Sequence, residues 1–322
     1  MNRDDFIRLL GKSLDEFGRL VAGSLRSDIA LLDQVNASLM ENAGKQLRPM
    51  LLLLVAGASG EISSDSVHYA AAVEMLHNAT LLHDDVADRS STRRGQPTLC
   101  ALMGPSAAVL VGDFWLSKAM DHVVNTKHKD GAIKLFSNTL SLLAEGEMLQ
   151  LQKAERADTT EEDYLRIIYC KTASLFETAC RVAAISVDAE PRLCEAAGRY
   201  GRALGMAFQI RDDIFDYTEG SEIGKPVGLD LKEHKITLPL LGTLRSCPDP
   251  DAIRGMVRDI TNHPEYCDQL RDYVLGNGGI EYASSRLGDF ISEALQALEA
   301  FSPSAHRDML RTIANYNAIR TK

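Results

Sequence analysis

Helical periodicity is the feature that most limits the folds open to this chain. From Phe6 to Leu25, apolar residues recur at steps of three and four positions, which is the spacing of an amphipathic helix. Period-two alternation and Asn-Gly hairpin signals are scarce. The sequence therefore predicts an all-α fold without a β-sheet. Further segments with the helical spacing are 67–82, 107–120, 132–151, 161–184 and 193–215.

Segments containing glycine and proline divide the helical stretches into separate helices. No Ser/Gly-rich linker, change in composition or array-type repeat divides the chain further. We therefore expect a single helical-bundle domain spanning residues 1–322. The expected loops are 44–49, 90–97, 220–228, 247–250, 262–264, 276–279 and 302–303.

The composition excludes some partners and compartments. A net charge of −10 argues against a nucleic-acid-binding face, and a hydrophobic share of 45% is that of a globular protein with a core. The 6 cysteines form no C-x-x-C pair, so we expect free thiols rather than zinc or disulfides. No apolar stretch has the length of a signal peptide or a membrane span. We expect a cytoplasmic protein.

Two aspartate clusters with the same spacing carry the strongest functional signal. Each has acids at positions i, i+1 and i+4, within 84–88 and 212–216. On a helix, the first and last of these lie about 40° apart in projection and share a face. Apolar residues precede both clusters, and no lysine is interspersed to offset the repulsion. Carboxylates in such surroundings need a cation.

Magnesium fits these clusters better than other metals. Oxygen-only donors favour Mg²⁺ or Ca²⁺ over zinc, and the Asp-x-Asp-x-Asp-Gly pattern of a calcium loop is absent. Mg²⁺ binds through one or two carboxylates plus phosphate oxygens, which suits two clusters that share a diphosphate. The alternative is two solvated acidic helix ends, and the repeated spacing argues against it. The predicted ligands are Asp84, Asp85, Asp88, Asp212, Asp213 and Asp216.

Basic residues near the first cluster could hold a diphosphate. Lys45 and Arg48 lie in a loop before a helix. Arg93 and Arg94 follow the cluster. Arginine binds phosphate oxygens as a fork, whereas lysine acts as a mobile point charge. His77 lies about two helical turns before the cluster on the same face, although a hydrogen-bonded core histidine is the ordinary alternative.

A second group of candidates lies around the later cluster. Lys171 and Thr172 fall within a helical stretch, and Gln209 lies on the same side of its helix as the cluster. Lys225 and Lys235 flank the loop that follows. For any one such residue, a solvated surface position is the alternative.

Short motifs follow one another in a fixed order along nearly the whole chain. They are Gly-Lys-Gln-Leu-Arg-Pro at 44–49, Leu-Leu-His-Asp-Asp-Val-Ala-Asp at 81–88, Arg-Arg-Gly at 93–95, Val-Gly-Asp-Phe at 111–114, Lys-Thr at 171–172, Phe-Gln-Ile-Arg-Asp-Asp-Ile-Phe-Asp at 208–216, Gly-Lys-Pro at 224–226 and Lys-Ile-Thr-Leu-Pro-Leu at 235–240. Together they resemble the trans-polyprenyl diphosphate synthase family. Within this family they look most like the octaprenyl-type bacterial synthases. Each motif alone is modestly specific, whereas all of them in order are highly specific.

The resemblance implies an isoprenoid-synthase-type bundle with a deep central cavity, a homodimer, and Mg²⁺-dependent addition of isopentenyl diphosphate to an allylic diphosphate. The catalytic residues it implies are Asp84, Asp88, Asp212 and Lys171, with Asp85, Asp213 and Asp216 supporting the metal. Those it assigns to isopentenyl diphosphate are Lys45, Arg48, His77 and Arg94. Those it assigns to the allylic diphosphate are Arg93, Lys171, Thr172, Gln209, Lys225 and Lys235.

Product length is predicted from the helix that precedes the first cluster. Relatives that stop at short chains have bulky aromatic residues near this position, whereas Ala79 and Thr80 are small. The resemblance thus implies a hexaprenyl to decaprenyl product, whose tail we expect to run past Ala79. Such a product could be released close to a membrane. Trp115 and Met120 could set a deeper floor, although packing in the core is the alternative for both.

Two departures and several rival functions accompany this interpretation. Arg89 stands where an acidic or small residue is commoner, and His234 replaces the glycine usual before Lys235. The rivals are a short-chain farnesyl or geranylgeranyl diphosphate synthase, a class I terpene cyclase and a non-catalytic partner subunit. A cyclase would leave the basic residues around the first cluster unexplained. A partner subunit would be expected to lose acidic residues, and both clusters are intact.

Overall fold

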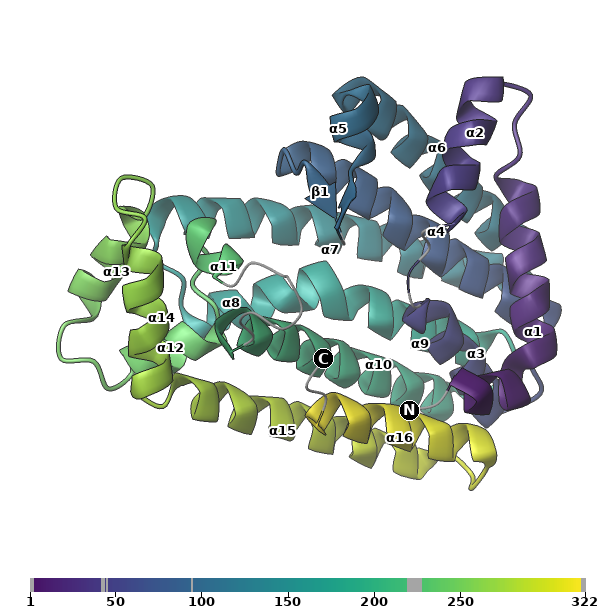
Figure 1. Cartoon of the computed structure of the whole chain (residues 1–322). Helices are drawn as coiled ribbons and strands as arrows, with labels where there is room; N and C mark the ends of the chain where they lie inside the picture. Colours follow the sequence, from purple (N-terminus) through teal and green to yellow (C-terminus); the bar gives the residue numbers. More distant parts are fainter. Residues whose placement is uncertain (1–2, 42–43, 45, 94, 219–227, 320–322) are drawn as a thin grey trace. The chain divides into compact units, whose positions relative to one another are not determined.

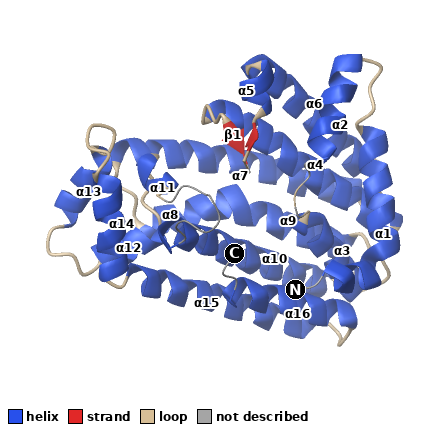
Figure 2. Ribbon diagram, viewed as in Figure 1, coloured by secondary structure: helices blue, strands red, loops and turns tan. Residues whose placement is uncertain are grey.

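Helices make up almost all of the structure, a computed structural model that describes residues 3–41, 44, 46–93, 95–218 and 228–319. The all-α prediction is confirmed (Figures 1 and 2). A π-helical turn, η1 (Tyr169–Ala173), joins α8 to α9, and a 3₁₀ turn, η2 (Leu298–Ala300), follows α15. The α-helices are α1 (Arg3–Ser24), α2 (Ala30–Glu41), α3 (Leu47–Ser59), α4 (Ser64–Ala87), α5 (Leu99–Met103), α6 (Pro105–Val124), α7 (Lys129–Arg156), α8 (Glu161–Ile168), α9 (Ser174–Ile185), α10 (Pro191–Thr218), α11 (Leu229–Lys232), α12 (Leu238–Leu244), α13 (Pro250–Arg258), α14 (Tyr266–Gly276), α15 (Gly279–Ala297) and α16 (Ala305–Ile319).

The prediction that the chain has no β-sheet is wrong at one point. Strands β1 (Thr92–Arg93) and β2 (Gln96–Pro97) pair in antiparallel fashion, as the red segment of Figure 2 shows. Gly95, in the turn between them, has a φ of 77°, a left-handed conformation that favours glycine. A two-residue strand is too short to show period-two alternation, so the sequence pattern could not reveal it.

The chain divides into two compact units. One comprises residues 1–136, 179–197 and 300–310, and the other 137–178, 198–299 and 311–322. The boundaries fall within α7, α9, α10, η2 and α16, so no flexible linker separates the units in the sequence. The single domain over residues 1–322 and its central cavity stay predictions.

Helix α4 forms the centre of the first unit. Residues 69–76 are buried without interruption, so this part of the helix has no side that faces solvent. Helices α1, α3 and α6 pack against it (Figure 1). A capping box closes its first turn, in which Ser63 and Ser66 each accept a hydrogen bond from the other's backbone N–H. The first aspartate cluster lies at the other end of this helix, and its position is therefore fixed by a buried segment.

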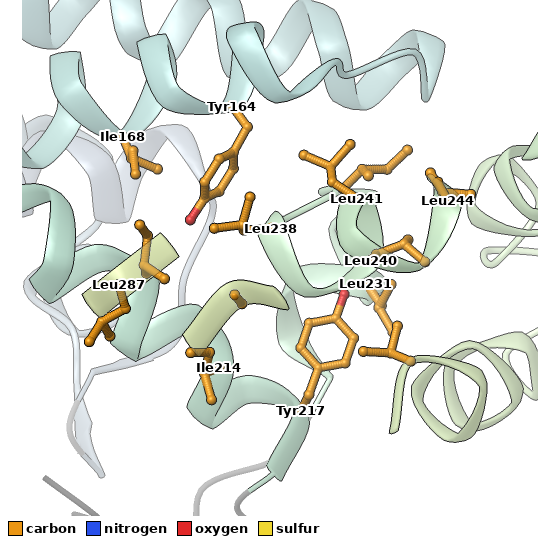
Figure 3. Close-up of a cluster of buried hydrophobic side chains, with 14 of the residues drawn as sticks. Tyr164, Ile168, Ile214, Tyr217, Leu231, Leu238, Leu240, Leu241, Leu244 and Leu287 are labelled. Atoms are coloured by element: carbon orange, nitrogen blue, oxygen red, sulfur yellow. The ribbon is translucent and has the colours of Figure 1, made fainter. Parts of the chain in front are cut away.

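A hydrophobic cluster fills the second unit (Figure 3). It draws side chains from α8, α10, α12 and α15, among them Tyr164, Ile214, Leu241 and Leu287, and none of these four is more than 6% exposed. Burial of one such side chain stabilises the fold by about 1.5–3 kcal/mol. The second aspartate cluster belongs to the same stretch of α10 as Ile214, so the core holds it in place.

Among the described helices, none combines the length and the apolar character needed to cross a membrane.

Candidate active site

The first aspartate cluster occupies the last turn of α4. Asp84 is half-buried, Asp85 is buried, and Asp88 is the exposed residue at which the helix ends. Arg93 Nε donates a hydrogen bond of 2.8 Å to Asp85 Oδ1. This pair neutralises the buried member of the cluster, and it brings one predicted diphosphate-binding residue next to a predicted metal-supporting one.

The first cluster, and Asp216 of the second, lie where a helix disfavours negative charge. The carbonyl end of a helix carries a partial negative charge, so carboxylates there are destabilising and cations are favoured. Neither α4 nor α10 has a basic residue in its last turn. The repulsion inferred from the sequence is thus increased by the helix ends, and a bound cation would relieve it.

The close approach of α6 fixes the first cluster from the side. A Cβ atom at Gly112 would lie 2.4 Å from His83 Nε2, so a larger residue would displace the imidazole ring. Nε2 of the same ring lies 3.3 Å from Asp113 Oδ1. The Val-Gly-Asp-Phe motif therefore gains a physical explanation, because its glycine and its aspartate both contact the residue directly before Asp84.

Two of the residues predicted to bind isopentenyl diphosphate lie together in the first unit. Arg48 at the start of α3 lies 3.0 Å from His77 on α4, measured from Nη1 to Nε2. Since arginine only donates, His77 Nε2 must accept, which leaves the ring proton on Nδ1. Lys45 and Arg94, the other two predicted residues, lie outside the described residues.

The second cluster is built into the end of α10. Asp212 is half-buried, and Asp213 is buried and accepts hydrogen bonds from Tyr164 at 2.6 Å and from Gln209 at 2.9 Å. Asp216 accepts two backbone N–H groups, those of Leu229 and Asp230, each at 3.0 Å. The middle and last acids of this cluster are thus held by protein donors.

Burial perturbs the acids of this cluster. It raises the pKa of Asp213 to about 6, against the lowering effect of its two hydrogen bonds, and the charges of Asp212 and Asp216 raise it further. Burial likewise raises the pKa of Asp216, and it raises that of Asp230 well above the ordinary value. Desolvated carboxylates so close together favour a counter-cation.

A cavity of about 160 Å³ lies beside the second cluster, within the second unit. It contains four of the residues predicted to bind the allylic diphosphate: Lys171, Thr172, Gln209 and Lys235. Lys225, from the same predicted set, lies outside the described residues, and Arg93 belongs to the first unit. The other polar residues that line the cavity are Gln150, Lys153, Thr159, Tyr164, Asp213, Asp230 and Thr237.

Each of the three lysines of the cavity has an acidic partner. Lys171 pairs with Glu147, and Lys235 pairs with Glu233. Lys153 lies 2.8 Å from Asp163 and 3.2 Å from Asp158, and its hydrogen bond to Asp163 raises its pKa. These contacts limit the movement of the ammonium groups, so the cavity can bind an anion at an ordered site.

The turn that carries Lys171 and Thr172 is irregular and tightly packed. It is the π-helical turn η1, and such turns are frequent at functional sites. A Cβ atom at Gly205 of α10 would lie 2.6 Å from Ala173 Cα, so the two backbones approach as closely as glycine allows. The predicted phosphate-binding pair therefore lies on a turn whose distance from α10 is fixed by packing.

The two departures from the family pattern both adopt left-handed backbone conformations. Arg89 has a φ of 51° and His234 a φ of 57°, which explains why glycine is usual at the second position. His234 Nδ1 donates to the Val257 carbonyl at 2.8 Å, and its Nε2 lies 3.0 Å from Thr261 Oγ1. Two hydrogen bonds thus hold His234 in a backbone conformation that glycine would adopt without strain. Lys235 directly follows it.

The residues of the predicted chain-length pocket lie on two helices of the first unit. Ala79 is 1% exposed on α4, and the Thr80 hydroxyl donates to the His77 carbonyl at 2.8 Å. Trp115 on α6 is 2% exposed, and its Nε1 donates to Asn36 at 2.9 Å. That bond agrees with the packing alternative for Trp115, and the pocket itself stays a prediction.

Sequence reasoning missed several residues that complete the site. Tyr164, Glu147 and Asp230 each contact a predicted site residue or line the cavity with it. Glu147 follows Gly146, where a Cβ atom would lie only 2.6 Å from Cys170 Cβ, so glycine allows α7 to approach η1 closely. This glycine within a helix could have drawn attention to Glu147. No pattern in the sequence singles out Tyr164. Over the described ranges, no group of three or more acidic, histidine or cysteine side chains lies close enough together to hold a metal ion.

Comparisons with known proteins identify the family of the chain. The family model "Polyprenyl synthetase" matches residues 29–274. The chain is 38% identical over 312 residues to the all-trans-nonaprenyl-diphosphate synthase (geranyl-diphosphate specific) of Rhodobacter capsulatus, covering 96% of this chain and 95% of that one. It is 34% identical over 320 residues to the octaprenyl diphosphate synthase of Escherichia coli, covering 98% of both.

Solved structures give the same result. The fold matches a decaprenyl diphosphate synthase from Rhodobacter capsulatus with a TM-score of 0.93 and 34% identity, over 100% of both chains. It also matches a polyprenyl synthase from Caulobacter crescentus, complexed with calcium and isoprenyl diphosphate, with a TM-score of 0.91 and 33% identity over 100% of this chain and 98% of that one. From its motifs, its fold and its similarity over almost its full length, the chain belongs to the polyprenyl synthetase family of trans-prenyltransferases.

Proposed function

We propose that this protein adds isopentenyl diphosphate to an allylic diphosphate and makes a medium- to long-chain all-trans polyprenyl diphosphate. The observation that carries the proposal is the cavity of the second unit, where lysines and hydroxyl groups line the space next to buried carboxylates. Such a site attracts an anion and a cation together, as a diphosphate with its counter-ion requires. The names of the relatives, which are nonaprenyl and octaprenyl synthases, support the chain length.

The divalent ion is proposed to be Mg²⁺. Its main ligands would be Asp84, Asp88 and Asp212, with Asp85, Asp213 and Asp216 in support. The oxygen-only donor set fits this ion, because Mg²⁺ usually takes few carboxylates and completes its shell with phosphate oxygens and water. Two solved neighbours carry calcium with isoprenyl diphosphate. When bound, the ion neutralises charge on the diphosphate that leaves.

The residues of the chain have distinct proposed roles in the reaction. Lys171, Thr172 and Lys235 would bind the allylic diphosphate, with Arg93, Gln209 and Lys225 in the same group. Lysine charge next to the diphosphate stabilises the anion that forms when the allylic carbon–oxygen bond ionises. Arg48 and His77, with Lys45 and Arg94, would orient isopentenyl diphosphate so that its double bond attacks the cation. We propose that the departing diphosphate accepts the proton released in this step.

Product length and assembly are part of the proposal. A hexaprenyl to decaprenyl chain fits the small residues at positions 79 and 80, although one relative, 32% identical, is a short-chain isoprenyl diphosphate synthase of Methanothermobacter thermautotrophicus. A homodimer and a cytoplasmic location are proposed from the sequence and the resemblance. Product release close to a membrane is proposed from the length of the tail.

Product analysis tests the proposed function. Purified protein is incubated with labelled isopentenyl diphosphate, Mg²⁺ and, in turn, geranyl, farnesyl or geranylgeranyl diphosphate, and the dephosphorylated products are sized by chromatography. Hexaprenyl to decaprenyl products support the proposal, whereas products that end at farnesyl or geranylgeranyl length contradict the proposed chain length. Asp212→Ala should abolish elongation, and Asp251→Ala, which removes an exposed acid at the start of α13, should not. Absence of product with every primer would contradict the activity itself.

A further inference from the structure

We infer that Tyr164 is a positioning residue for the allylic-diphosphate site, acting through Asp213 on the turn that carries Lys171 and Thr172. The inference rests on the proposed function for its substrate and on the contacts of the second unit for its geometry. Tyr164 belongs to none of the sequence motifs.

Both oxygens of the Asp213 carboxylate accept hydrogen bonds from protein groups. Tyr164 OH donates to Oδ2 at 2.6 Å, and Gln209 Nε2 donates to Oδ1 at 2.9 Å. The two donors come from different segments, α8 and α10. They fix the rotation of the carboxylate, because turning it would lengthen both bonds at once.

The bond from Tyr164 lies inside the core. Its ring lies in the hydrophobic cluster near Ile168 and Leu238 (Figure 3), and the side chain is only 3% exposed. Burial raises the pKa of Tyr164 well above its ordinary value, so the phenol keeps its proton and remains a donor. A hydrogen bond to a buried charge contributes more than one between neutral groups.

The network continues to the turn that carries the predicted phosphate-binding pair. Thr172 Oγ1 donates to Gln209 Oε1 at 2.7 Å. The Gln209 amide therefore has one allowed orientation, with its oxygen toward Thr172 and its nitrogen toward Asp213. Tyr164, Asp213, Gln209 and Thr172 form one chain of hydrogen bonds, and the last three of these residues, like the first, line the cavity.

The substitution Tyr164→Phe removes one hydroxyl and leaves the ring in the core. Asp213 would keep a single donor and could rotate, which loosens Gln209 and then Thr172. We expect the KM for the allylic diphosphate to rise about tenfold, the effect of losing a hydrogen bond to a charged group. The KM for isopentenyl diphosphate should stay within about twofold, because the hydrogen bond between Arg48 and His77 includes no residue of this chain of bonds.

A matched control removes a similar bond from the same helix. Tyr282 OH donates to Glu161 Oε2 at 2.6 Å, at the first residue of α8, and neither residue lines the cavity. Tyr282→Phe therefore loses a phenol–carboxylate bond of equal length, and the bond that the hydroxyl accepts from Arg245 at 2.8 Å, without touching Asp213. If Tyr164 only stabilises α8, the two variants will behave alike.

The test combines kinetics with a measurement that needs no turnover. KM and kcat for both substrates, the dissociation constant of inorganic diphosphate with Mg²⁺ by titration calorimetry, and thermal unfolding are measured for the parent, Tyr164→Phe and Tyr282→Phe. A selective rise in the allylic KM and in the diphosphate dissociation constant, in Tyr164→Phe alone, supports the inference. Equal rises in both KM values, no rise at all, or the same rise in Tyr282→Phe would overturn it.

Failure of the proposed function gives a different result. In that case the parent protein forms no prenyl product with any primer, whereas diphosphate binding still separates the two variants if the positioning role holds. A double variant, Tyr164→Phe with Thr172→Val, tests the connection itself. If both act through Asp213 and Gln209, the rise of its dissociation constant over that of the parent will be smaller than the product of the rises in the two single variants, whereas a rise equal to that product would contradict the connection.

Discussion

The substitution Gly205→Ala should impair the allylic-diphosphate site more than it impairs the fold. The added Cβ would lie 2.6 Å from Ala173 Cα and 3.2 Å from Phe176 Cβ, and the first of these is a backbone atom that no rotamer change can move. Relief to an ordinary carbon–carbon contact requires α10 and η1 to separate by about 1 Å. The Thr172–Gln209 hydrogen bond, now 2.7 Å long, would then exceed the range of a hydrogen bond.

The magnitudes distinguish stability from activity. Overpacking costs about 1–3 kcal/mol, and the higher helix propensity of alanine offsets about 1 kcal/mol of it, so the net loss of stability is about 0–2 kcal/mol. A displacement of about 1 Å at a substrate-positioning turn can lower kcat/KM about 100-fold. Urea unfolding and steady-state kinetics with each substrate varied in turn measure the two effects separately.

Gly288→Ala provides the control for this prediction. Nothing lies within 4 Å of the position its Cβ would take on α15, so we expect a gain of up to about 1 kcal/mol and unchanged kinetics. If Gly205→Ala behaves like Gly288→Ala, with higher stability and parental kcat/KM for the allylic substrate, the argument from the close approach is wrong.

Three further predictions concern other parts of the molecule. Ala79→Tyr should shorten the product by filling the predicted path of the tail, and an unchanged chain length on chromatography would refute the pocket. Asp84→Ala and Asp212→Ala should each lower kcat by at least about 1,000-fold, because charge on the leaving diphosphate would lose its counter-ion. Their circular dichroism should stay near that of the parent. Parental rates would refute their role as metal ligands. Burial, and then the neighbouring His68, lower the pKa of His122 to about 4, so folding favours its neutral form. The free energy of unfolding should therefore fall as the pH drops from about 6.5 to 4, by up to about 3 kcal/mol. His122→Gln should flatten this dependence in urea titrations at the two pH values, and equal slopes for parent and variant would contradict the assignment.

The sequence predicted most of the helical fold and singled out candidate site residues, because both depend on local signals. The period of apolar residues depends only on neighbours a few positions apart, and it located α4 and α10, the helices that end in the two aspartate clusters. The same spacing could not reveal η1, since one extra residue in a turn leaves the apolar pattern almost unchanged.

Residues that act through distant partners were beyond sequence reasoning. Tyr164 and Asp213 are 49 positions apart, and nothing in either segment indicates that the two side chains meet. His234 was recognised as a departure, but its hydrogen bonds to residues 257 and 261 and its left-handed backbone depend on the tertiary fold. Such contacts are set by packing, which a single sequence does not encode in a readable pattern.

The location of the aspartate clusters at the carbonyl ends of α4 and α10 links folding to supply of substrate. The acids that lie in these last turns, those of the first cluster and Asp216 of the second, make the empty protein less stable than it would be with neutral residues, and whatever neutralises them returns that free energy. A ligand present at a hundred times its dissociation constant adds about 2.7 kcal/mol to the free energy of unfolding. Heating curves can therefore rank candidate primers with no catalysis at all, and a cell short of isoprenoid precursors would hold this enzyme in its most heat- and protease-sensitive form.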